Sequence, residues 1–375
     1  MNLSTQLEEL LSVEAFAFCR NVSSFGAEEG VSVWLTGGLV RDLFLGRSSK
    51  DLDISVSSMG VGFAEKLSRR YNIDVTAKFE RYGCVALRLE DGSRCDIVPL
   101  RKEHYPAPAA PPEITFIDSI EEDLLRRDFS LNAMALSLQN SDFGELYDFY
   151  GGHEDLKTQT LRILHDQSFM DDPVRIFRGI RFAVRMNLAL ALETKDVLFD
   201  SYNKGAMKAL PNKVFLREFE STFSSANISS LFKVLNEWEL LKQMEWPGFS
   251  SGSPDSIVVK IDLIHGIIKS FLRNGKSIRT RKCSWLSVLA VIVLVPPKAH
   301  NYFLRRFTPP GHIVAYLDEV KKLYIEMKTG LSSGIEALRE VLKRPRKTEI
   351  LVGAIAVASN SKDDEMHFHE ALNML

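Results

Sequence analysis

Two short clusters near the start of the chain combine residue types that suit the binding of a nucleoside triphosphate. Gly37 and Gly38 stand between a strand-like and a helix-like run. Glycine lets a phosphate approach the backbone, and the start of a helix offers free N–H groups to it. Arg41 follows one turn later, within reach of the same phosphates. Asp51 and Asp53 are two apart on an expected strand, so both carboxylates point to one face.

Two carboxylates on one face repel each other unless a cation lies between them. Mg²⁺ favours such oxygen ligands together with substrate phosphates, and two of these ions suit in-line attack of a hydroxyl on a nucleotide α-phosphate. A lone Gly-Gly is usually a turn and a lone Asp-x-Asp a solvated strand. Six fixed positions at fixed spacing arise by chance in only about 10⁻⁵ of chains this long, taking roughly 5% for each residue type. The combination therefore predicts nucleotidyl transfer, with Asp51 and Asp53 as catalytic metal ligands.

The elements that must position these residues are predicted to form a mixed α and β region. Helical spacing and β-branched or alternating runs predict helices over 4–25, 39–45 and 61–71, and strands over 31–35, 51–56, 75–80, 84–89 and 93–98. Glu90-Asp91-Gly92 is a hairpin turn signal. The proline-rich stretch 105–112 excludes a helix or a central strand, and we expect a mobile loop there. Beyond about residue 155 the pattern is nearly all helical.

The pattern Gly-Gly-x-x-Arg-Asp followed by Asp-x-Asp resembles the catalytic head of the polymerase-β-type nucleotidyltransferase superfamily. More specifically, it resembles the bacterial and eukaryotic class of tRNA CCA-adding enzymes, class II, which also contains bacterial poly(A) polymerases. Further segments that resemble this family are 122–135, 147–156, 171–182 and, less closely, 210–220.

The resemblance implies an α+β fold in three parts. A polymerase-β-like nucleotidyltransferase head, a mixed sheet with helices, is expected over residues 1–150. An all-α neck that contains the nucleotide-selecting helix is expected over 151–245, and a helical body and tail that binds tRNA over 246–375.

The resemblance also assigns roles within the segment 122–135. In the family this motif contacts the ribose and triphosphate of the incoming nucleotide, which points to Arg127, Asp128 and Asn132. Without the other motifs, Arg126, Arg127 and Asp128 would be interpreted as a surface ion-pair cluster. Asp96 lies on a strand where the superfamily often places a third carboxylate, which helps bind metal or activates the primer hydroxyl. An aspartate without a catalytic role is an equal alternative, because aspartates are common at strand ends.

Base selection is assigned to Asp172 and Arg175, three apart on an expected helix and therefore on one face. Cytosine and adenine both present an amino donor beside an unprotonated ring nitrogen, whereas uracil and guanine present a carbonyl beside a ring N–H. An aspartate acceptor next to an arginine donor fits C and A, and each mismatched buried polar group costs about 1–3 kcal/mol. The family uses this pair as a protein template, with Arg178 expected to support it one turn later. An ordinary intrahelical ion pair is the alternative.

The charge is unevenly distributed along the chain. Its net charge is −2, but residues 251–375 hold 19 basic and 12 acidic residues, a net of +7. This asymmetry favours a polyanion as partner of the C-terminal third, and the basic clusters 269–282 and 343–347 are candidate tRNA contacts. The four cysteines form no CxxC pair, which favours a cytoplasmic setting. No signal peptide is apparent, and the longest apolar run, 285–297, is too short to span a membrane.

The predicted function is template-independent addition of C, A or both to the 3′ end of tRNA. CTP and ATP are the expected substrates, Mg²⁺ the expected cofactor and pyrophosphate the by-product. The chain could be a monomer or a homodimer. Enzymes that add CCA, CC only or A only remain open alternatives, as do a poly(A) polymerase and an inactive RNA-binding relative. The segments 79–83 and 132–135 favour the CCA-adding branch over the poly(A) polymerases.

Overall fold

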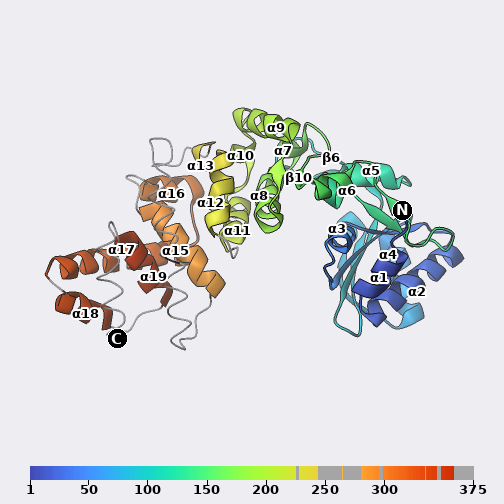
Figure 1. The fold of residues 1–375 in the computed structure, drawn as a ribbon, viewed down its shortest axis with the longest axis horizontal. Helices are drawn as coiled ribbons and strands as arrows, with labels where there is room; N and C mark the ends of the chain where they lie inside the picture. Colours follow the sequence, from blue (N-terminus) through green and yellow to red (C-terminus); the bar gives the residue numbers. More distant parts are fainter. Residues whose placement is uncertain are drawn as a thin grey trace. The chain divides into compact units, whose positions relative to one another are not determined.

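The chain forms two compact units in the computed structural model, which describes residues 1–224, 228–243, 264, 280–294, 299–333, 335–343 and 348–358. The first unit comprises residues 1–175 and 186–206, and the second residues 176–185 and 207–375 (Figure 1). The first is a mixed sheet with helices, and the described residues of the second are helical, which confirms the expected α+β class. The boundaries at residues 150 and 245 stay predictions. No described helix is both long and apolar enough to cross a membrane.

A seven-stranded sheet forms the centre of the first unit, in the order β3-β4-β5-β2-β1-β8-β9. Its strands are β1 (Val33–Thr36), β2 (Asp51–Val56), β3 (Asp74–Phe79), β4 (Cys84–Arg88), β5 (Arg94–Pro99), β8 (Ala135–Ser137) and β9 (Leu146–Tyr147). β2 and β5 run parallel, and all other neighbours in this sheet are antiparallel. The parallel pair brings the strand of Asp51 and Asp53 next to the strand of Asp96.

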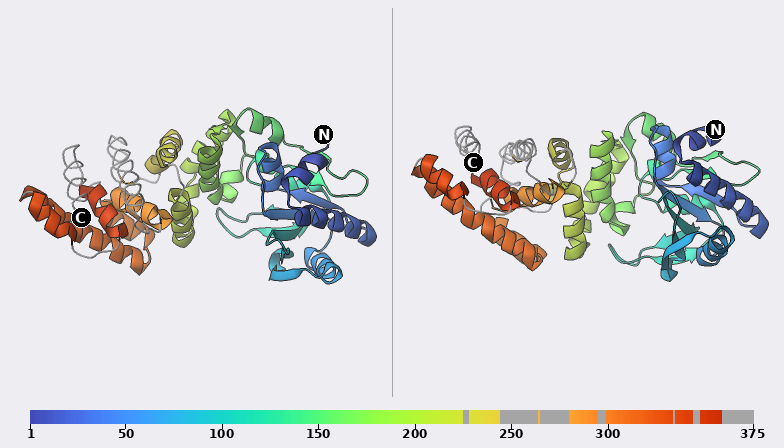
Figure 2. Two further views of the ribbon diagram at one scale, coloured as in Figure 1. Left: turned by 60° about the horizontal axis from the view of Figure 1, so that its bottom comes forward. Right: turned by 90° about the horizontal axis from the view of Figure 1, so that it is seen from below.

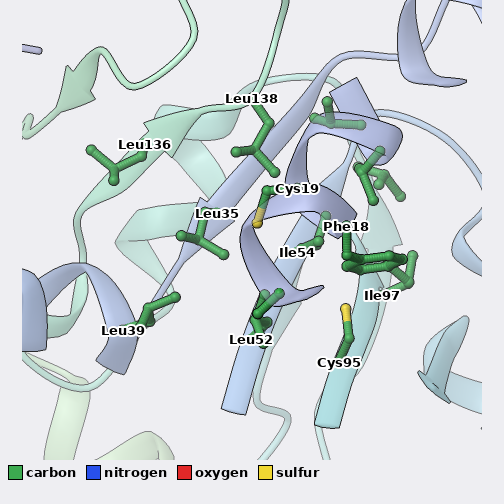
Figure 3. Packing of buried hydrophobic residues seen from close by; sticks show 14 of the residues in the cluster. Phe18, Cys19, Leu35, Leu39, Leu52, Ile54, Cys95, Ile97, Leu136 and Leu138 are labelled. Carbon is green, nitrogen blue, oxygen red and sulfur yellow. The ribbon is translucent and has the colours of Figure 1, made fainter. Parts of the chain in front are cut away.

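Strand alternation separates the core of this unit from its polar face. Leu52 and Ile54 of β2 are buried, whereas Asp51 is exposed and Asp53 half-buried. The apolar side packs against the helices α1 (Ser4–Leu10), α2 (Val13–Glu29), α3 (Gly38–Phe44) and α4 (Gly60–Tyr71). Figure 3 shows Ile54 in this cluster together with Phe18 and Cys95. Because successive strand residues point to opposite faces, burial of the apolar residues fixes the carboxylates on the other face.

The expected helix over residues 4–25 is two helices in the structure. The break lies at Leu11 and Ser12, and the Ser12 hydroxyl accepts a hydrogen bond from the Ala15 backbone N–H at the start of α2. Serine is among the best residues for this capping position. The capping chemistry therefore outweighs the nearly continuous helical spacing.

The proline-rich segment connects two strands that the sequence did not indicate. β6 (Arg101–His104) and β7 (Glu113–Phe116) pair as an antiparallel hairpin next to α5 (Ile120–Leu125). Between them, the Ala109 backbone N–H donates to the Asp171 carbonyl oxygen at 3.3 Å. The turn of the hairpin therefore touches the segment that precedes the predicted base-selecting residues.

Gly151 and Gly152 form a second glycine pair, and Gly152 allows two backbone segments of the first unit to approach closely. Gly152 begins α6 (Gly152–Lys157), and a β-carbon there would lie 2.2 Å from the Ser130 carbonyl oxygen. Asp148 accepts hydrogen bonds from the backbone N–H groups of Gly152 and His153. The close approach therefore requires glycine, and it fixes the short 3₁₀ helix η2 (Ser130–Asn132) against α6.

Helix α8 (Val174–Met186) begins in the first unit, and its residues 176–185 belong to the second. The remaining elements of the first unit are β10 (Thr160–Leu161), α7 (Ser168–Asp171), β11 (Ala189–Leu190) and α9 (Leu192–Asn203). Asp172 lies between α7 and α8 with an extended backbone, so the expectation that Asp172 and Arg175 share one helix is wrong. Pro173 explains the difference, because the residue before a proline is disfavoured in the helical region.

The second unit has an aromatic core. Its described helices are α10 (Ala206–Ala209), α11 (Asn212–Phe223), α12 (Ile228–Glu237), α13 (Leu240–Gln243), α15 (Thr280–Leu294), α16 (Ala299–Phe307), α17 (Gly311–Ser332), α18 (Ile335–Lys343) and α19 (Thr348–Ala358). Phe215, Phe219 and Phe223 stack along one side of α11, and Phe307 of α16 stacks on Phe215 at 4.5 Å between ring centroids. Helices α15, α17 and α19 pack side by side (Figures 1 and 2). The side chains of the basic clusters 269–282 and 343–347 lie outside the described residues.

Candidate active site

Gly37 marks the point where three sequence motifs meet. It precedes α3 with φ 77° and ψ −141°, a conformation that only glycine adopts readily. A β-carbon at this position would lie 2.9 Å from Asp53 Oδ2 and 3.1 Å from Arg127 Nη1. The end of β1, the Asp-x-Asp strand and the segment 122–135 therefore come together around one backbone atom. A β-carbon at Gly38 would lie 3.4 Å from Arg41 Nη2.

The three predicted carboxylates lie on neighbouring strands. Asp53 is the register partner of Asp96 in the parallel β2–β5 pair, and Asp51 is the partner of Arg94. Arg94 donates to both carboxylate oxygens of Asp96, at 2.9 and 2.8 Å. Asp96 therefore lies beside Asp53, but an arginine of its own strand engages its carboxylate.

The electrostatics around Asp53 favour a cation. Burial raises the pKa of this carboxyl, the Arg127 charge lowers it, and the neighbouring Asp96 and Asp51 raise it further. The net direction is upward, so the local positive charge does not fully offset the cost of a buried carboxylate among like charges. In the described part of the chain, no three His, Cys, Asp or Glu side chains form a group able to hold a metal. Metal binding by Asp51 and Asp53 thus stays a prediction.

Arg41, Asn132 and Asp128 form one buried hydrogen-bonded network. Arg41 Nη1 donates to Asn132 Oδ1 at 2.7 Å, and Asn132 Nδ2 donates to Asp128 Oδ1 at 2.9 Å. The rest of the Arg41 guanidinium donates to Asp42 Oδ1 through Nε and Nη2, both at 2.9 Å. All four side chains are buried. The surface ion-pair interpretation of this segment does not hold for Asp128, which is 7% exposed.

Two acidic residues that the sequence reasoning did not single out hold this segment in place. Asp123 is fully buried and accepts hydrogen bonds from the Arg101 backbone N–H at 3.0 Å and from Arg126 Nε at 2.9 Å. Glu103 of β6 accepts from Arg101 Nε at 2.9 Å and from Arg126 Nη1 at 3.3 Å. These ion pairs fasten the β6–β7 hairpin to α5. The only sequence signal was that Asp123 falls at a core-facing position of an acidic helix.

Arg175 is 4% exposed and is held by neutral acceptors. Nη1 donates to the Ser168 hydroxyl at 2.7 Å, and Nη2 donates to the Arg126 carbonyl oxygen at 2.7 Å. Asp172 caps α8 instead of lying within it, because its Oδ1 accepts from the Val174 backbone N–H at 3.0 Å. Arg178 follows one turn after Arg175 on α8 and belongs to the second unit.

Comparison with known proteins agrees with this arrangement. Residues 33–162 match the family model described as the poly(A) polymerase head domain. An A-adding tRNA nucleotidyltransferase of Aquifex aeolicus is 30% identical over 84% of this chain and 36% of its own length. A CC-adding tRNA nucleotidyltransferase of Deinococcus radiodurans is 40% identical over 42% of each chain. This chain thus spans less than half the length of these relatives.

The solved structures extend the likeness to the whole chain. The structure of a Thermotoga maritima CCA-adding enzyme complexed with tRNA superimposes with a TM-score of 0.79 and 25% identity, covering 100% of this chain and 85% of that one. The head motifs, the fold and these relatives agree with one another. Residues 33–162 match a poly(A) polymerase head domain, and the chain as a whole is similar to tRNA nucleotidyltransferases and CCA-adding enzymes.

Proposed function

We propose that the chain adds C, A or both to the 3′ end of tRNA, using CTP and ATP and releasing pyrophosphate. The observation that carries this proposal is the close approach at Gly37, where Asp53 and Arg127 would both touch an added β-carbon. A glycine backbone open to a phosphate, a half-buried carboxylate and a cationic side chain thus converge on one point. This is the combination that attack on a nucleotide α-phosphate requires.

Mg²⁺ fits the side chains at this point. Asp51 and Asp53 would hold it, since hard oxygen donors suit this ion. Burial, and then the neighbouring Asp96 and Asp51, raise the pKa of Asp53, so a nearby cation would favour its ionised form. When bound, the ion would neutralise phosphate charge and favour ionisation of the primer hydroxyl. Asp96 would contribute only after release from Arg94, which now engages both of its carboxylate oxygens.

The remaining head residues would bind and orient the nucleotide. The backbone at Gly37 and Gly38 would receive the triphosphate at the start of α3, supported by Arg127. Arg41 is hydrogen-bonded to Asn132, and Asn132 to Asp128. This network would present the triphosphate and ribose contacts as one preorganised unit, which lowers the cost of orienting the reacting groups.

Asp172 and Arg175 would select the base. Arg175 is oriented by its bonds to Ser168 and to the Arg126 carbonyl. A fixed arginine donor beside an aspartate acceptor matches the Watson–Crick edges of C and A and mismatches those of U and G. We propose that Arg178 supports this pair. Equal incorporation fidelity after Asp172→Ala with Arg175→Ala would refute the assignment.

The acceptor is proposed to be tRNA, because the relatives named above are tRNA nucleotidyltransferases and the C-terminal third carries a net charge of +7. Phosphate contacts of such a basic region would recognise the backbone and shape of the tRNA. A cytoplasmic location is proposed on the same ground, because tRNA, CTP and ATP meet there.

The deciding experiment offers the purified chain three tRNAs, ending at the discriminator base, at C and at CC. Each is incubated with CTP, ATP or both, and the products are resolved at single-nucleotide resolution. Addition that stops at CCA, CC or the final A would support the proposal and identify the branch. Because the Aquifex relative is named an A-adding enzyme, the tRNA ending at CC is tested first. Long runs of A would instead favour a poly(A) polymerase, and no product on any tRNA would contradict the proposal.

A further inference from the structure

His165 contacts the proposed base-selecting arginine from the segment between β10 and α7. Its Nε2 lies 3.4 Å from Arg175 Nη1, and its Nδ1 lies 4.0 Å from Asp171 Oδ2. The side chain is 31% exposed, so solvent protons reach it. The three residues form a row in which the imidazole lies between a carboxylate and a guanidinium.

The chemistry of the two neighbours determines the tautomer of this imidazole. A guanidinium has only donors, so a hydrogen bond to Arg175 requires an unprotonated Nε2 that accepts. The neutral ring then carries its proton on Nδ1, the atom that faces the Asp171 carboxylate. The ring nitrogens of histidine are commonly set by the partner of the other nitrogen, and both partners here favour the same form.

The acceptors around Arg175 are all uncharged groups. Nη1 meets the Ser168 hydroxyl and His165 Nε2, and Nη2 meets the Arg126 carbonyl oxygen. Three of its five N–H groups are thereby directed at protein atoms, and the donors left for a nucleobase are Nε–H and the second N–H of Nη2. The direction of these two donors depends on the acceptors that hold the others.

We propose that neutral His165, oriented by Asp171, is a positioning residue that aims the Arg175 guanidinium and so contributes to the selection of C and A. This inference rests on the function proposed above. It also gives Asp171 a role: its carboxylate favours the Nδ1–H tautomer.

The charged groups around His165 make this arrangement pH-sensitive. Burial is the main cause that lowers the pKa of His165, and the Arg175 charge lowers it further, whereas Asp171 and Asp166 raise it. The charge of His104 in the β6–β7 hairpin lowers the pKa of Asp171. The net direction is downward from the ordinary histidine value of about 6.5. The acceptor form therefore prevails at neutral pH, and acid places an Nε2–H donor against the Arg175 donors.

The first test measures selectivity, as the ratio of kcat/KM for the correct nucleotide over its mismatched partner, ATP over GTP or CTP over UTP. His165→Phe keeps an aromatic ring without an acceptor and should lower this ratio about tenfold at pH 7.5, the equivalent of one hydrogen bond. His165→Gln offers a carbonyl acceptor that does not titrate. It should retain the ratio and lose its pH dependence, whereas the unaltered chain should lose selectivity as pH falls from 7.5 to 5.5.

A matched control is His153→Phe. His153 stacks on Phe44 at 4.2 Å between ring centroids, and burial also lowers its pKa. This substitution should leave both the selectivity ratio and its pH profile unchanged. Unaltered selectivity in His165→Phe at every pH would overturn the inference, as would a pH profile that persists in His165→Gln.

A second test is independent of catalysis. Nitrogen-15 chemical shifts of the His165 ring report the tautomer directly, with spectra of His165→Gln used to assign the signal. We expect the Nδ1–H tautomer at pH 7.5, and in Arg175→Lys or Asp171→Asn a shift toward the mixture that an isolated imidazole shows. An Nε2–H tautomer in the unaltered chain would refute the inference even if the chain adds nucleotides to tRNA. Conversely, a chain that shows the expected tautomer but leaves tRNA unextended would refute the proposed function, and with it the role in base selection, but not the orientation of Arg175 by His165.

Discussion

The interiors of the two units contain different kinds of side chain. In the first, charged side chains are buried around the proposed site, including Arg41, Asp123, Asp128 and Arg175. In the second, the described core is built from stacked rings such as Phe215 and Phe219, and Glu218 is its only described charged side chain that is buried. Burying a charge costs free energy unless partners offset it, whereas burying an aromatic ring contributes free energy directly.

This difference indicates where the chain accepts a cost to stability for the sake of function. The buried charges named here are hydrogen-bonded to side chains or backbone groups of the first unit, as Arg41 is to Asp42 and Asn132. Such networks hold polar groups in fixed directions before a ligand arrives, which is the condition for electrostatic catalysis. Among the described residues of the second unit, buried charge is confined to Glu218 with its partners Arg181 and Arg217, and the core is otherwise stabilised by packing. Substitutions in the first unit should therefore affect activity more than stability, and substitutions in the second unit should affect stability more than activity.

Asp53→Asn should give the largest effect and separate activity from stability. Loss of the carboxylate that we propose binds Mg²⁺ should lower kcat/KM on the order of 10⁴-fold. In EDTA the melting temperature at pH 7 should rise by a few degrees, because the raised pKa of Asp53 means that its ionised form disfavours the folded state.

The direction of this change in melting temperature follows from the link between the pKa of a group and the pH dependence of folding stability. A raised folded-state pKa gives a contribution to stability that is present below the ordinary aspartate pKa of about 3.9 and lost as pH rises through the folded-state value. The difference in melting temperature should thus vanish near pH 3.5 and grow toward pH 7. A lower melting temperature for Asp53→Asn at pH 7 would show that this carboxylate is satisfied without metal.

Phe219→Ala, in the second unit, should have the opposite effect: a loss of stability without a change in nucleotide selectivity. The ring is 1% exposed and stacks between Phe215 and Phe223, so its removal should cost about 3–5 kcal/mol of unfolding free energy. Urea unfolding followed by circular dichroism measures this loss. Selectivity among nucleotides should not change in the molecules that stay folded. Phe149→Ala is the control, because Phe149 is 44% exposed and should cost less than about 1 kcal/mol.

Gly37→Ala tests the convergence point itself. The added methyl group would meet Asp53 Oδ2 at 2.9 Å in a backbone conformation that disfavours side chains. Displacement of the proposed catalytic groups should lower kcat/KM about 100-fold. Gly46→Ala is the matched control: it also has positive φ, 61°, but nothing lies within 4 Å of the added atom. Its activity should stay near that of the unaltered chain, and equal losses in both variants would show that backbone strain alone explains the effect.

Glu218→Gln should have the smallest effect. Glu218 is 7% exposed and pairs with Arg181 and Arg217, each at 3.0 Å. Glutamine keeps a hydrogen-bond acceptor but loses the charge, so we expect a stability loss of about 1–2 kcal/mol and unchanged kcat/KM. Glu220→Gln, at an exposed position of the same helix, should change stability by less than about 0.5 kcal/mol. A loss of activity in Glu218→Gln without a loss of stability would contradict the expectation that substitutions in the second unit affect stability more than activity.

Elements with a clear periodic pattern were predictable from the sequence. β2 was expected over 51–56 and is Asp51–Val56, because charged and apolar residues alternate along it. β6 was not predicted, because Arg101-Lys-Glu-His104 has no apolar face and its pairing with β7 is not visible in the sequence. The placement of Asp172 on a helix failed because the helical spacing was given more weight than the conformational restriction that Pro173 imposes.

In the candidate site, too, the sequence could predict features that lie close together in the chain but not contacts between distant residues. The residue types of the site could be chosen from the motifs, since each motif is a short stretch with its own spacing. The bond between Arg41 and Asn132 joins residues 91 positions apart and depends on the packing of α3 against η2. The engagement of Asp96 by Arg94 depends on side-chain rotamers, which no sequence pattern specifies. Contacts of this kind became visible only in the structure.

The approach of Gly152 to Ser130 has a consequence for how mutational data on this chain would be interpreted. A β-carbon at Gly152 would stand 2.2 Å from a backbone oxygen, which no rotamer change can relieve. In a saturation library scored by growth or product formation, every substitution there would be depleted as strongly as those at the carboxylates. Depletion alone would thus group a residue that only lets two backbone segments touch with the residues that we propose bind the nucleotide. A parallel score for protein abundance would separate the two groups.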